Sequence, residues 1–392
     1  MAGVIPPIIL LCLCSVLYFH WRRRRRIKGK GDGKLHAHHS LMTLDTDSAI
    51  KLWENEEAGS SLVLYSFSQI ENATDNFSAQ NKLGEGGFGP VYKGNLPDGQ
   101  VIAVKRLAAN SGQGLVEFKN EVLLIAKLQH INLVRLLGCC IQGEEKILIY
   151  EYMKNKSLDF FLFEQSRRVV LDWTMRIHII EGIAHGLLYL HKHSRLRIIH
   201  RDLKASNILL DSDMNPKISD FGMARIFGSN KTQANTNRVV GTFGYMAPEY
   251  AMEGIFSVKS DVFSFGVLLL EIIGGTRNAG SHQRGHSLNL LGHAWELWEK
   301  GRWSDLIDPS SLDACPEQKV HRCIHIGLMC VQEKAADRPT MNEVISMLAS
   351  DNITIADPRQ PAFLSTVLPA ETVAHEESCS LNEITITNLD GR

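Results

Sequence analysis

The chain has 392 residues, of which 44% are hydrophobic, and its formal net charge is -1. This length is too great for one hydrophobic core and favours two lobes or domains with tails, while the near-zero charge argues against a chain-wide nucleic-acid-binding field. Eight cysteines without a C-x-x-C pair argue against a disulfide framework and a zinc or thioredoxin-like site, and they favour a reducing, intracellular environment.

The N-terminal stretch is apolar and ends in an arginine cluster. Residues 2–21 carry no formal charge, and Arg22–Arg26 follow directly. A helix over this stretch would be about 30 Å long, enough to cross a hydrocarbon core, with Pro6 and Pro7 in its first turn. A cleaved signal peptide would have its charges before the apolar stretch instead. We expect a transmembrane anchor over residues 1–21, with a cleaved signal and a non-inserting N-terminus as alternatives.

The arginine cluster also sets the expected orientation. Positive charge stays on the cytoplasmic side of a membrane, which places everything after Arg22–Arg26 in the cytoplasm. The same charges would attract anionic lipids of the inner leaflet. A nucleic-acid-binding arm is disfavoured, because the cluster adjoins an apolar segment and no aromatic-interleaved basic surface accompanies it.

Two irregular segments flank a compact body. Residues 22–76 are first basic and then rich in Gly, His and Ser, which predicts a flexible juxtamembrane linker. Residues 351–392 contain several Glu, Ser and Thr without periodicity, which predicts a disordered acidic tail. The folded domain is therefore expected over residues 77–350.

The body begins with strand patterns and continues with helical ones. Two apolar runs between residues 82 and 107 flank the Pro97–Gly99 turn, which predicts antiparallel strands, and short apolar runs return over 133–152. Apolar residues recur at helical spacing over the following ranges: 114–129, 172–193, 258–273, 287–300 and 318–332. The expected fold class is α+β, a small β-rich lobe followed by a larger helical lobe.

The first chemical motif is a glycine-rich loop at Gly84, Gly86 and Gly89. A dinucleotide-binding turn would continue into a helix, whereas here Pro90 and a strand follow, so the loop is expected to cap a β-hairpin. Glycines in such a loop let the backbone approach triphosphate oxygens. A merely flexible turn is the alternative.

The second motif is Lys105, which ends the apolar strand that follows this loop. Together with the loop it is expected to contact α- and β-phosphates, and it then needs a carboxylate to hold its ammonium group. Glu121 on the 114–129 helix is the preferred partner, and Glu117 one turn earlier is the alternative.

The third motif is an ordered set of polar residues between 200 and 222. Asp202 is placed to orient and accept the proton of an attacking hydroxyl, as phosphoryl transfer requires. Asn207 and Asp220 offer the oxygen ligands that Mg²⁺ prefers, and Lys204 can lie against the transferred phosphate. In the order glycine loop, lysine, H-R-D, D-F-G and A-P-E, these residues leave little room for coincidence.

These motifs resemble eukaryotic protein kinases over about residues 77–348. Stretches such as HRDLKASNILLD and GTFGYMAPEYAMEG are similar to plant receptor-like Ser/Thr kinases of the cysteine-rich and S-domain groups, here without their extracellular domain. The resemblance implies a bilobal fold that binds ATP and Mg²⁺, with Mn²⁺ as an alternative ion. It implies catalytic roles for Asp202, Lys204, Lys105 and Glu121, with Asn207 and Asp220 as metal ligands. It implies the following ATP-binding residues: Gly84, Glu85, Gly86, Gly87, Phe88, Gly89, Val91, Ala103, Lys105, Glu151, Met153 and Leu209.

The resemblance also bears on specificity and control. Lys204 before Asn207 is typical of Ser/Thr kinases, with some tyrosine activity left open. Arg201 beside Asp202 implies regulation by a phosphorylated activation segment, because a phosphate can neutralise an unpaired guanidinium group. The expected regulatory residues are Arg201, Thr236, Thr232 and Thr242, of which Thr242 is either a switch or a structural hydroxyl. Asp261 and an Arg338–Glu249 pair are expected to be scaffold.

The leading hypothesis is a single-pass Ser/Thr kinase in the plasma membrane, with its kinase domain in the cytoplasm. It would phosphorylate itself and other signalling proteins, work beside a partner receptor kinase, and bind no nucleic acid. The alternatives are a non-catalytic docking protein, which the intact motifs disfavour, and a ligand-binding receptor, for which the chain offers no extracellular site.

Overall fold

The computed structural model describes residues 62–86, 89–107, 112–227, 233–278, 289–311 and 315–362. The expected anchor over residues 1–21 and the arginine cluster lie outside these ranges. Within them, no helix has the length and apolar character needed to cross a membrane.

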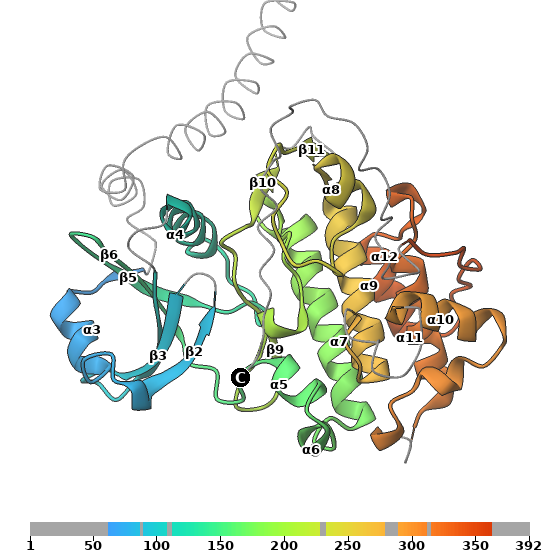
Figure 1. The fold of residues 1–392 in the computed structure, drawn as a ribbon, viewed down its shortest axis with the longest axis horizontal. Helices are drawn as coiled ribbons and strands as arrows, with labels where there is room; N and C mark the ends of the chain where they lie inside the picture. Colours follow the sequence, from blue (N-terminus) through green and yellow to red (C-terminus); the bar gives the residue numbers. More distant parts are fainter. Residues whose placement is uncertain are drawn as a thin grey trace, which may run out of the picture. The chain divides into compact units, whose positions relative to one another are not determined.

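A six-stranded sheet forms the first part of the described chain (Figure 1). The strand order is β1-β5-β6-β4-β3-β2. The strands are β1 (Val63–Leu64), β2 (Lys82–Gly86), β3 (Gly89–Asn95), β4 (Val101–Arg106), β5 (Leu136–Gln142) and β6 (Glu145–Glu151). Neighbours from β5 to β2 are antiparallel, as the turn residues predict, and β1 pairs with β5 in parallel.

The alternation of residues along β4 divides the apolar packing between the two faces of the sheet. Ile102 and Val104 are buried together with Ile70 of α3 (Phe67–Ala73). The intervening Ala103 packs against the other face, in the cluster that contains Phe118 of α4 (Gly112–Ile125). Since side chains alternate along a strand, one helix covers each face, and Lys105 belongs to the α4 side.

The predicted linker extends too far toward the C-terminus. Residues 62–76, placed in a flexible linker by the sequence, include β1 and α3, which pack onto the sheet. A Cβ on Gly138 of β5 would lie 2.2 Å from the Val63 carbonyl oxygen, so only glycine permits this close approach. Ser66 caps α3 and forms a reciprocal capping box with Gln69. The apolar side chains of a two-turn helix are too few to stand out in the sequence, which explains the error.

The second part of the chain is mainly helical, as predicted. Its helices are α5 (Leu158–Leu162), α6 (Gln165–Arg168), α7 (Trp173–Leu188), α8 (Pro248–Glu253), α9 (Val258–Gly274), α10 (Leu290–Glu299), α11 (Glu317–Cys330) and α12 (Met341–Ala349). α7 continues into a π-helical turn over Tyr189–His193. Figure 1 shows α9 in the middle of this lobe, and nearly all of its residues are buried. The sequence patterns did not single out α12.

Short strand pairs position the loops of the helical part. They are β7 (Arg197–Ile199) with β10 (Arg225–Phe227), β8 (Ile208–Leu210) with β9 (Pro216–Ile218), and β11 (Ala234–Asn235) with β12 (Ile255–Phe256). All three pairs are antiparallel. They bring the segments after His200, Asn207 and Ile218 close to one another.

The predicted tail also begins too early. Residues 351–362 lie along α11, where Arg322 donates to the Ile353 carbonyl at 2.8 Å and His325 bonds the Ala356 carbonyl at 2.8 Å. Gln332 donates to the Arg359 carbonyl at 2.7 Å. Polar side chains of α11 and of Gln332 just after it thus hold a segment that has no periodicity of its own, and of the predicted tail only residues 363–392 lie outside the described ranges.

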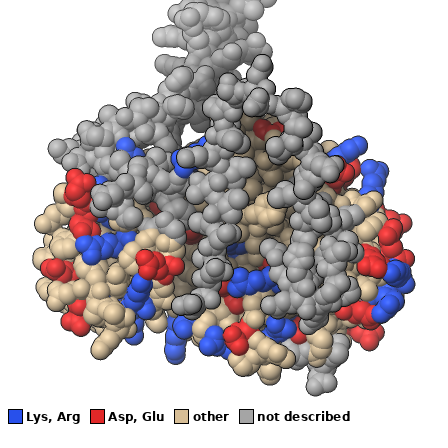
Figure 2. Space-filling view, in the orientation of Figure 1, with Lys and Arg blue, Asp and Glu red and all other residues tan. Residues whose placement is uncertain are grey.

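Positive and negative side chains are mixed on one face of the described chain. In the face that Figure 2 shows, Lys and Arg alternate with Asp and Glu, and the described residues form no large area of one sign there.

Candidate active site

Lys105 lies between two carboxylates. Its Nζ is 2.8 Å from Glu121 Oε1 on α4 and 3.0 Å from Asp220 Oδ1 in the D-F-G segment. The ion pair expected between Lys105 and Glu121 is therefore present. The side chain of the alternative partner, Glu117, is outside the part of the chain that the structure describes.

Burial and charge act in opposite directions in this triad. Burial alone would lower the pKa of Lys105, but Asp220 and Glu121 outweigh it and raise that pKa. Burial opposes ionisation of Asp220 as well, but Lys105 holds its pKa below the ordinary value. Burial raises the pKa of Glu121 to about 7, against the opposing effect of Lys105. Lys105 is thus kept as a cation and is held in place by the carboxylates of Glu121 and Asp220.

Asp261 of α9 fixes the loop after β7 through hydrogen bonds to its backbone. Asp261 accepts hydrogen bonds from the backbone N–H of His200 at 2.8 Å and of Arg201 at 2.9 Å. Burial opposes ionisation of Asp261, but the hydrogen bonds and positive charges of His191, His200 and Arg201 together outweigh it and lower the pKa. Arg201 has a φ of 71°, a strained value for a residue with a side chain. A buried anion therefore sustains a loop geometry that the chain would not adopt alone, which confirms the expected scaffold role of Asp261.

Asp202, Lys204 and Thr242 form one hydrogen-bonded group. Thr242 Oγ1 donates to Asp202 Oδ1 at 2.7 Å and accepts from Lys204 Nζ at 2.8 Å. Lys204 Nζ is also 3.1 Å from Asp202 Oδ2. Asn207 Nδ2 donates to the same carboxylate at 3.0 Å. Both oxygens of Asp202 are thus oriented by neighbours, and the Thr242 hydroxyl is hydrogen-bonded to both Asp202 and Lys204.

Asn207 and Asp220 lie at neighbouring positions. The Ser219 backbone N–H and hydroxyl both donate to the Asn207 carbonyl, each at 2.9 Å, so the chain directly before Asp220 is bonded to Asn207. An amide oxygen and a carboxylate beside a phosphate-directed cation are the donors that Mg²⁺ prefers. The residues present therefore fit this ion. Phe221 is fully buried and its ring packs edge-on against His200, with centroids 4.9 Å apart.

The glycine-rich segment is a β-hairpin, as expected. Glu85 pairs with Pro90 and Gly86 with Gly89, so a strand and not a dinucleotide-binding helix follows. A Cβ on Gly84 or Gly86 would have no neighbour within 4 Å. Gly87 and Phe88 lie outside the described residues.

The remaining predicted nucleotide contacts fall on the sheet and the connection between the two parts. Val91 pairs with Lys105 across β3 and β4, and Ala103 pairs with Tyr150 across β4 and β6. Glu151 ends β6, Met153 follows it, and Leu209 lies on β8. The Glu151 backbone N–H is already bonded to the Arg135 carbonyl at 3.1 Å.

The guanidinium group of Arg201 is not unpaired, as the argument for regulation assumed. Its Nη1 donates to the Met223 carbonyl at 3.1 Å and its Nη2 to Tyr250 Oη of α8 at 2.5 Å. The group also lies over the Phe256 ring of β12, 4.7 Å from the centroid. Its buried Nε has no hydrogen-bond partner among the described residues. Thr236 Oγ1 donates to the Arg238 carbonyl at 3.0 Å, and Thr232 lies outside the described residues.

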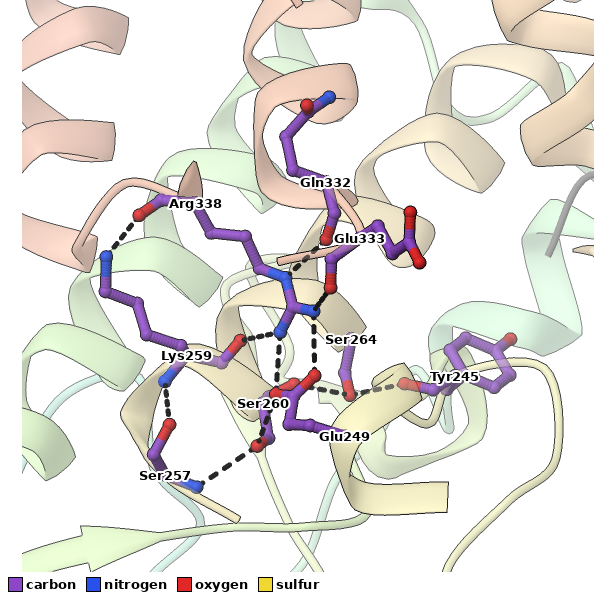
Figure 3. Close-up of polar contacts among 9 residues, drawn as sticks. All are labelled: Tyr245, Glu249, Ser257, Lys259, Ser260, Ser264, Gln332, Glu333 and Arg338. Atoms are coloured by element: carbon purple, nitrogen blue, oxygen red, sulfur yellow. Dashed lines mark hydrogen bonds and ion pairs between the residues drawn. The ribbon is translucent and has the colours of Figure 1, made fainter. Parts of the chain in front are cut away.

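The expected Arg338–Glu249 pair is present and fully satisfied (Figure 3). Nη1 and Nη2 of Arg338 each lie 2.8 Å from one oxygen of Glu249. The other donors reach three carbonyls, those of Gln332, Lys259 and Glu333. All five guanidinium N–H groups of Arg338 therefore have acceptors inside the helical part.

Besides Asp261, α9 carries a second buried carboxyl group, Glu271, which sequence reasoning missed. Tyr245 Oη donates to Glu271 Oε2 at 2.6 Å, and the Asn278 backbone N–H donates to Oε1 at 2.9 Å. Burial raises the pKa of Glu271 to about 7. Figure 3 shows Tyr245 also bound through its carbonyl by Ser264 of the same helix, at 2.7 Å. A single acid within the run GVLLLEII was the signal that could have identified it.

The comparisons with known proteins agree with this geometry. Residues 77–348 match a family described as protein tyrosine and serine/threonine kinase. The chain is 60% identical over 339 residues to the G-type lectin S-receptor-like serine/threonine-protein kinase B120 of Arabidopsis thaliana, covering 85% of this chain and 40% of that protein. It is 59% identical over 340 residues to the kinase SD1-1 of the same type and organism, covering 86% of this chain and 41% of that protein.

The chain thus spans about two fifths of the length of these relatives. The shared part is the one that contains Lys105, Asp202 and Asp220. The chain belongs to the protein tyrosine and serine/threonine kinase family, and its kinase region is of the plant S-domain receptor-like serine/threonine kinase type.

Proposed function

We propose that this chain transfers the γ-phosphoryl group of ATP to serine and threonine hydroxyls of itself and of other signalling proteins. The observation that carries the proposal is the oriented carboxylate of Asp202, bonded to Lys204, Thr242 and Asn207. A carboxylate with both oxygens directed by neighbours can hold an incoming hydroxyl in one orientation. Positioning and electrostatics are most of what phosphoryl transfer needs from a protein.

Each residue then has one task in the reaction. Asp202 orients the substrate hydroxyl and accepts its proton. Lys204, beside that carboxylate, neutralises charge on the transferred phosphoryl oxygens. Lys105, held by Glu121 and Asp220, positions the α- and β-phosphates. When bound, ATP supplies the phosphoryl group and Mg²⁺ or Mn²⁺ the divalent charge, with Asn207 and Asp220 as the protein ligands.

The nucleotide would lie under the hairpin. Open space beside Gly84 and Gly86 lets backbone N–H groups face the phosphates, and Glu85, Gly87, Phe88, Gly89 and Val91 complete this cover. The adenine would lie between Ala103 and Leu209 and bond the backbone at Glu151 and Met153. These assignments follow the family pattern residue by residue.

We further propose that the kinase region is tethered to a membrane. The support is the apolar stretch over residues 1–21 followed by Arg22–Arg26, together with the receptor-like names of the relatives. The kinase domain would face the cytoplasm beneath the plasma membrane, with the arginines near anionic lipids. Phosphorylation of Thr236 or Thr232 by the chain itself, or by a partner receptor kinase, would adjust the activation segment around Arg201.

The experiment is autophosphorylation of the full chain with labelled ATP. Lys105→Ala and Asp220→Ala are each expected to abolish transfer, because one removes the phosphate-directed cation and the other a metal ligand. Undetectable transfer by the unmodified chain, with nucleotide binding retained, would favour the non-catalytic docking protein instead. Unmodified activity in either variant would refute the assigned roles.

A further inference from the structure

A buried amide joins α4 to the D-F-G segment. Asn120, the residue directly before Glu121, is fully buried, and its Nδ2 donates to the Gly222 carbonyl at 2.7 Å. The two residues are 102 positions apart in the sequence. Gly222 closes the segment that begins with the metal ligand Asp220.

With this hydrogen bond, α4 and the D-F-G segment are joined by two separate links. Glu121 reaches Asp220 through Lys105, by two ionic contacts of 2.8 Å and 3.0 Å. Asn120 reaches Gly222 directly, without a charged group. Because the two residues are consecutive on one rigid helix, α4 cannot move away from the segment without breaking both links.

The neutral link has a defined cost when it breaks. The Gly222 carbonyl and the Asn120 amide, both buried, would lose their partner, and an unpaired buried polar group is unfavourable. Asp220 also has a φ of 63°, a conformation that a non-glycine residue keeps only where its surroundings hold it. Asn120 Oδ1 has no hydrogen-bond partner among the described residues, so the bond to Gly222 is what orients this amide.

We propose that Asn120 is a positioning residue, which couples the place of α4 to the conformation of Asp220 and thereby to metal binding. It touches neither substrate nor nucleotide and acts through the Gly222 carbonyl. The inference rests on the proposed kinase activity, since the metal ligand matters only in that reaction. It predicts that loss of the Asn120 donor lowers the apparent affinity for Mg²⁺ more than it lowers the stability of the fold.

Asn132 offers a matched control. Its side chain is also a buried amide, and its Nδ2 donates at 3.0 Å to the carbonyl of Pro216, the first residue of β9. Removing either donor costs one buried hydrogen bond to a backbone carbonyl. The Asn120 side chain bonds Gly222 of the D-F-G segment itself, whereas the Asn132 side chain bonds β9, which precedes that segment.

The experiment compares Asn120→Leu, Asn120→Ala and Asn132→Leu with the unmodified chain at full length. Asn120→Ala removes the donor without adding bulk or charge, so it serves if the leucine variant does not fold. For each folded protein, kcat, KM for a peptide and the Mg²⁺ concentration at half-maximal activity are measured. Both Asn120 variants are expected to lower kcat about tenfold and raise that Mg²⁺ concentration about threefold or more, with KM for the peptide unchanged.

Hydrogen–deuterium exchange gives a readout independent of catalysis. In the Asn120 variants, exchange is expected to rise together in peptides covering residues 112–125 and 219–225, and in Asn132→Leu in neither. Asn120 variants with unmodified Mg²⁺ dependence and exchange would overturn the proposal, as would an Asn132 variant with the same catalytic loss. An inactive unmodified chain would instead refute the proposed function. The exchange result would still show whether Asn120 couples α4 to the D-F-G segment.

Discussion

We predict that Thr242 acts as a structural hydroxyl and not as a phosphorylated switch, and the variant Thr242→Val tests this. Valine has nearly the shape of threonine but lacks the hydroxyl. The change removes the donor to Asp202 Oδ1 at 2.7 Å and the acceptor for Lys204 Nζ at 2.8 Å. The direct contact between Lys204 and Asp202, at 3.1 Å, remains.

The expected magnitude follows from these contacts. A hydrogen bond to a charged group contributes about 1.5–3 kcal/mol. If the bond to Asp202 orients the carboxylate in the transition state, its loss lowers kcat by about tenfold to about 150-fold. The stability of the fold should change little, because Thr242 is not in the buried core and Lys204 keeps its ionic partner.

The assay is steady-state phosphorylation of a peptide, with a thermal unfolding measurement for each protein. Thr242→Ser restores the hydroxyl and is expected to retain most of the activity. Thr242→Glu places a negative charge beside Asp202 and is expected to be at least as inactive as the valine variant. A valine variant within about threefold of the unmodified kcat, or an activated glutamate variant, would refute the structural assignment.

Three further predictions concern stability and topology. Arg338→Met removes the ion pair with Glu249, which keeps a hydrogen bond from Ser260 Oγ at 3.2 Å, and it removes the hydrogen bonds to three carbonyls. Calorimetry should therefore show a loss of about 3–5 kcal/mol. Arg359→Met, which breaks a surface pair with Asp337, should cost less than about 1 kcal/mol, and equal effects would contradict the burial argument. Burial raises the pKa of Glu271 from its ordinary value near 4.5 to about 7, so between these pH values the folded state binds a proton that the unfolded state has released. The stability of the fold therefore falls as pH rises from 4.5 to 7. Urea unfolding should therefore show Glu271→Gln gaining up to about 3 kcal/mol relative to the unmodified chain across this range, and a constant difference would disprove the assignment. The anchored orientation predicts that none of the N-x-S/T triplets after the arginines, at Asn72, Asn76, Asn155, Asn230 and Asn352, is glycosylated, and a shift in mobility on endoglycosidase treatment would reverse it.

Several features could be read from the chain because they are local. The order of the glycine loop, Lys105, H-R-D and D-F-G motifs defines the chemistry, since each motif is a short string with a required residue type. The long helices were predictable because apolar residues recur at helical spacing along α7 and α11, while α9 is a long apolar run that is buried on nearly all sides. The hairpin was predictable from its turn residues.

Other features depend on contacts between distant residues, and only the folded chain decides them. The charge on Arg201 was evident, but its partners Met223 and Tyr250 come from elements that pack beside it only after folding. The docking of residues 62–76 depends on a space left by Gly138, which no pattern within those residues records.

The amino-acid sequence by itself determined the class of reaction, because phosphoryl transfer needs particular residue types in a particular order. The tertiary structure decided which atoms meet: Thr242 with Asp202, Asn120 with Gly222, and Glu271 with Tyr245. The physical reason is that hydrogen bonding and burial depend on distance in space. Residues 40 or 102 positions apart become neighbours only when the helices and strands between them have packed.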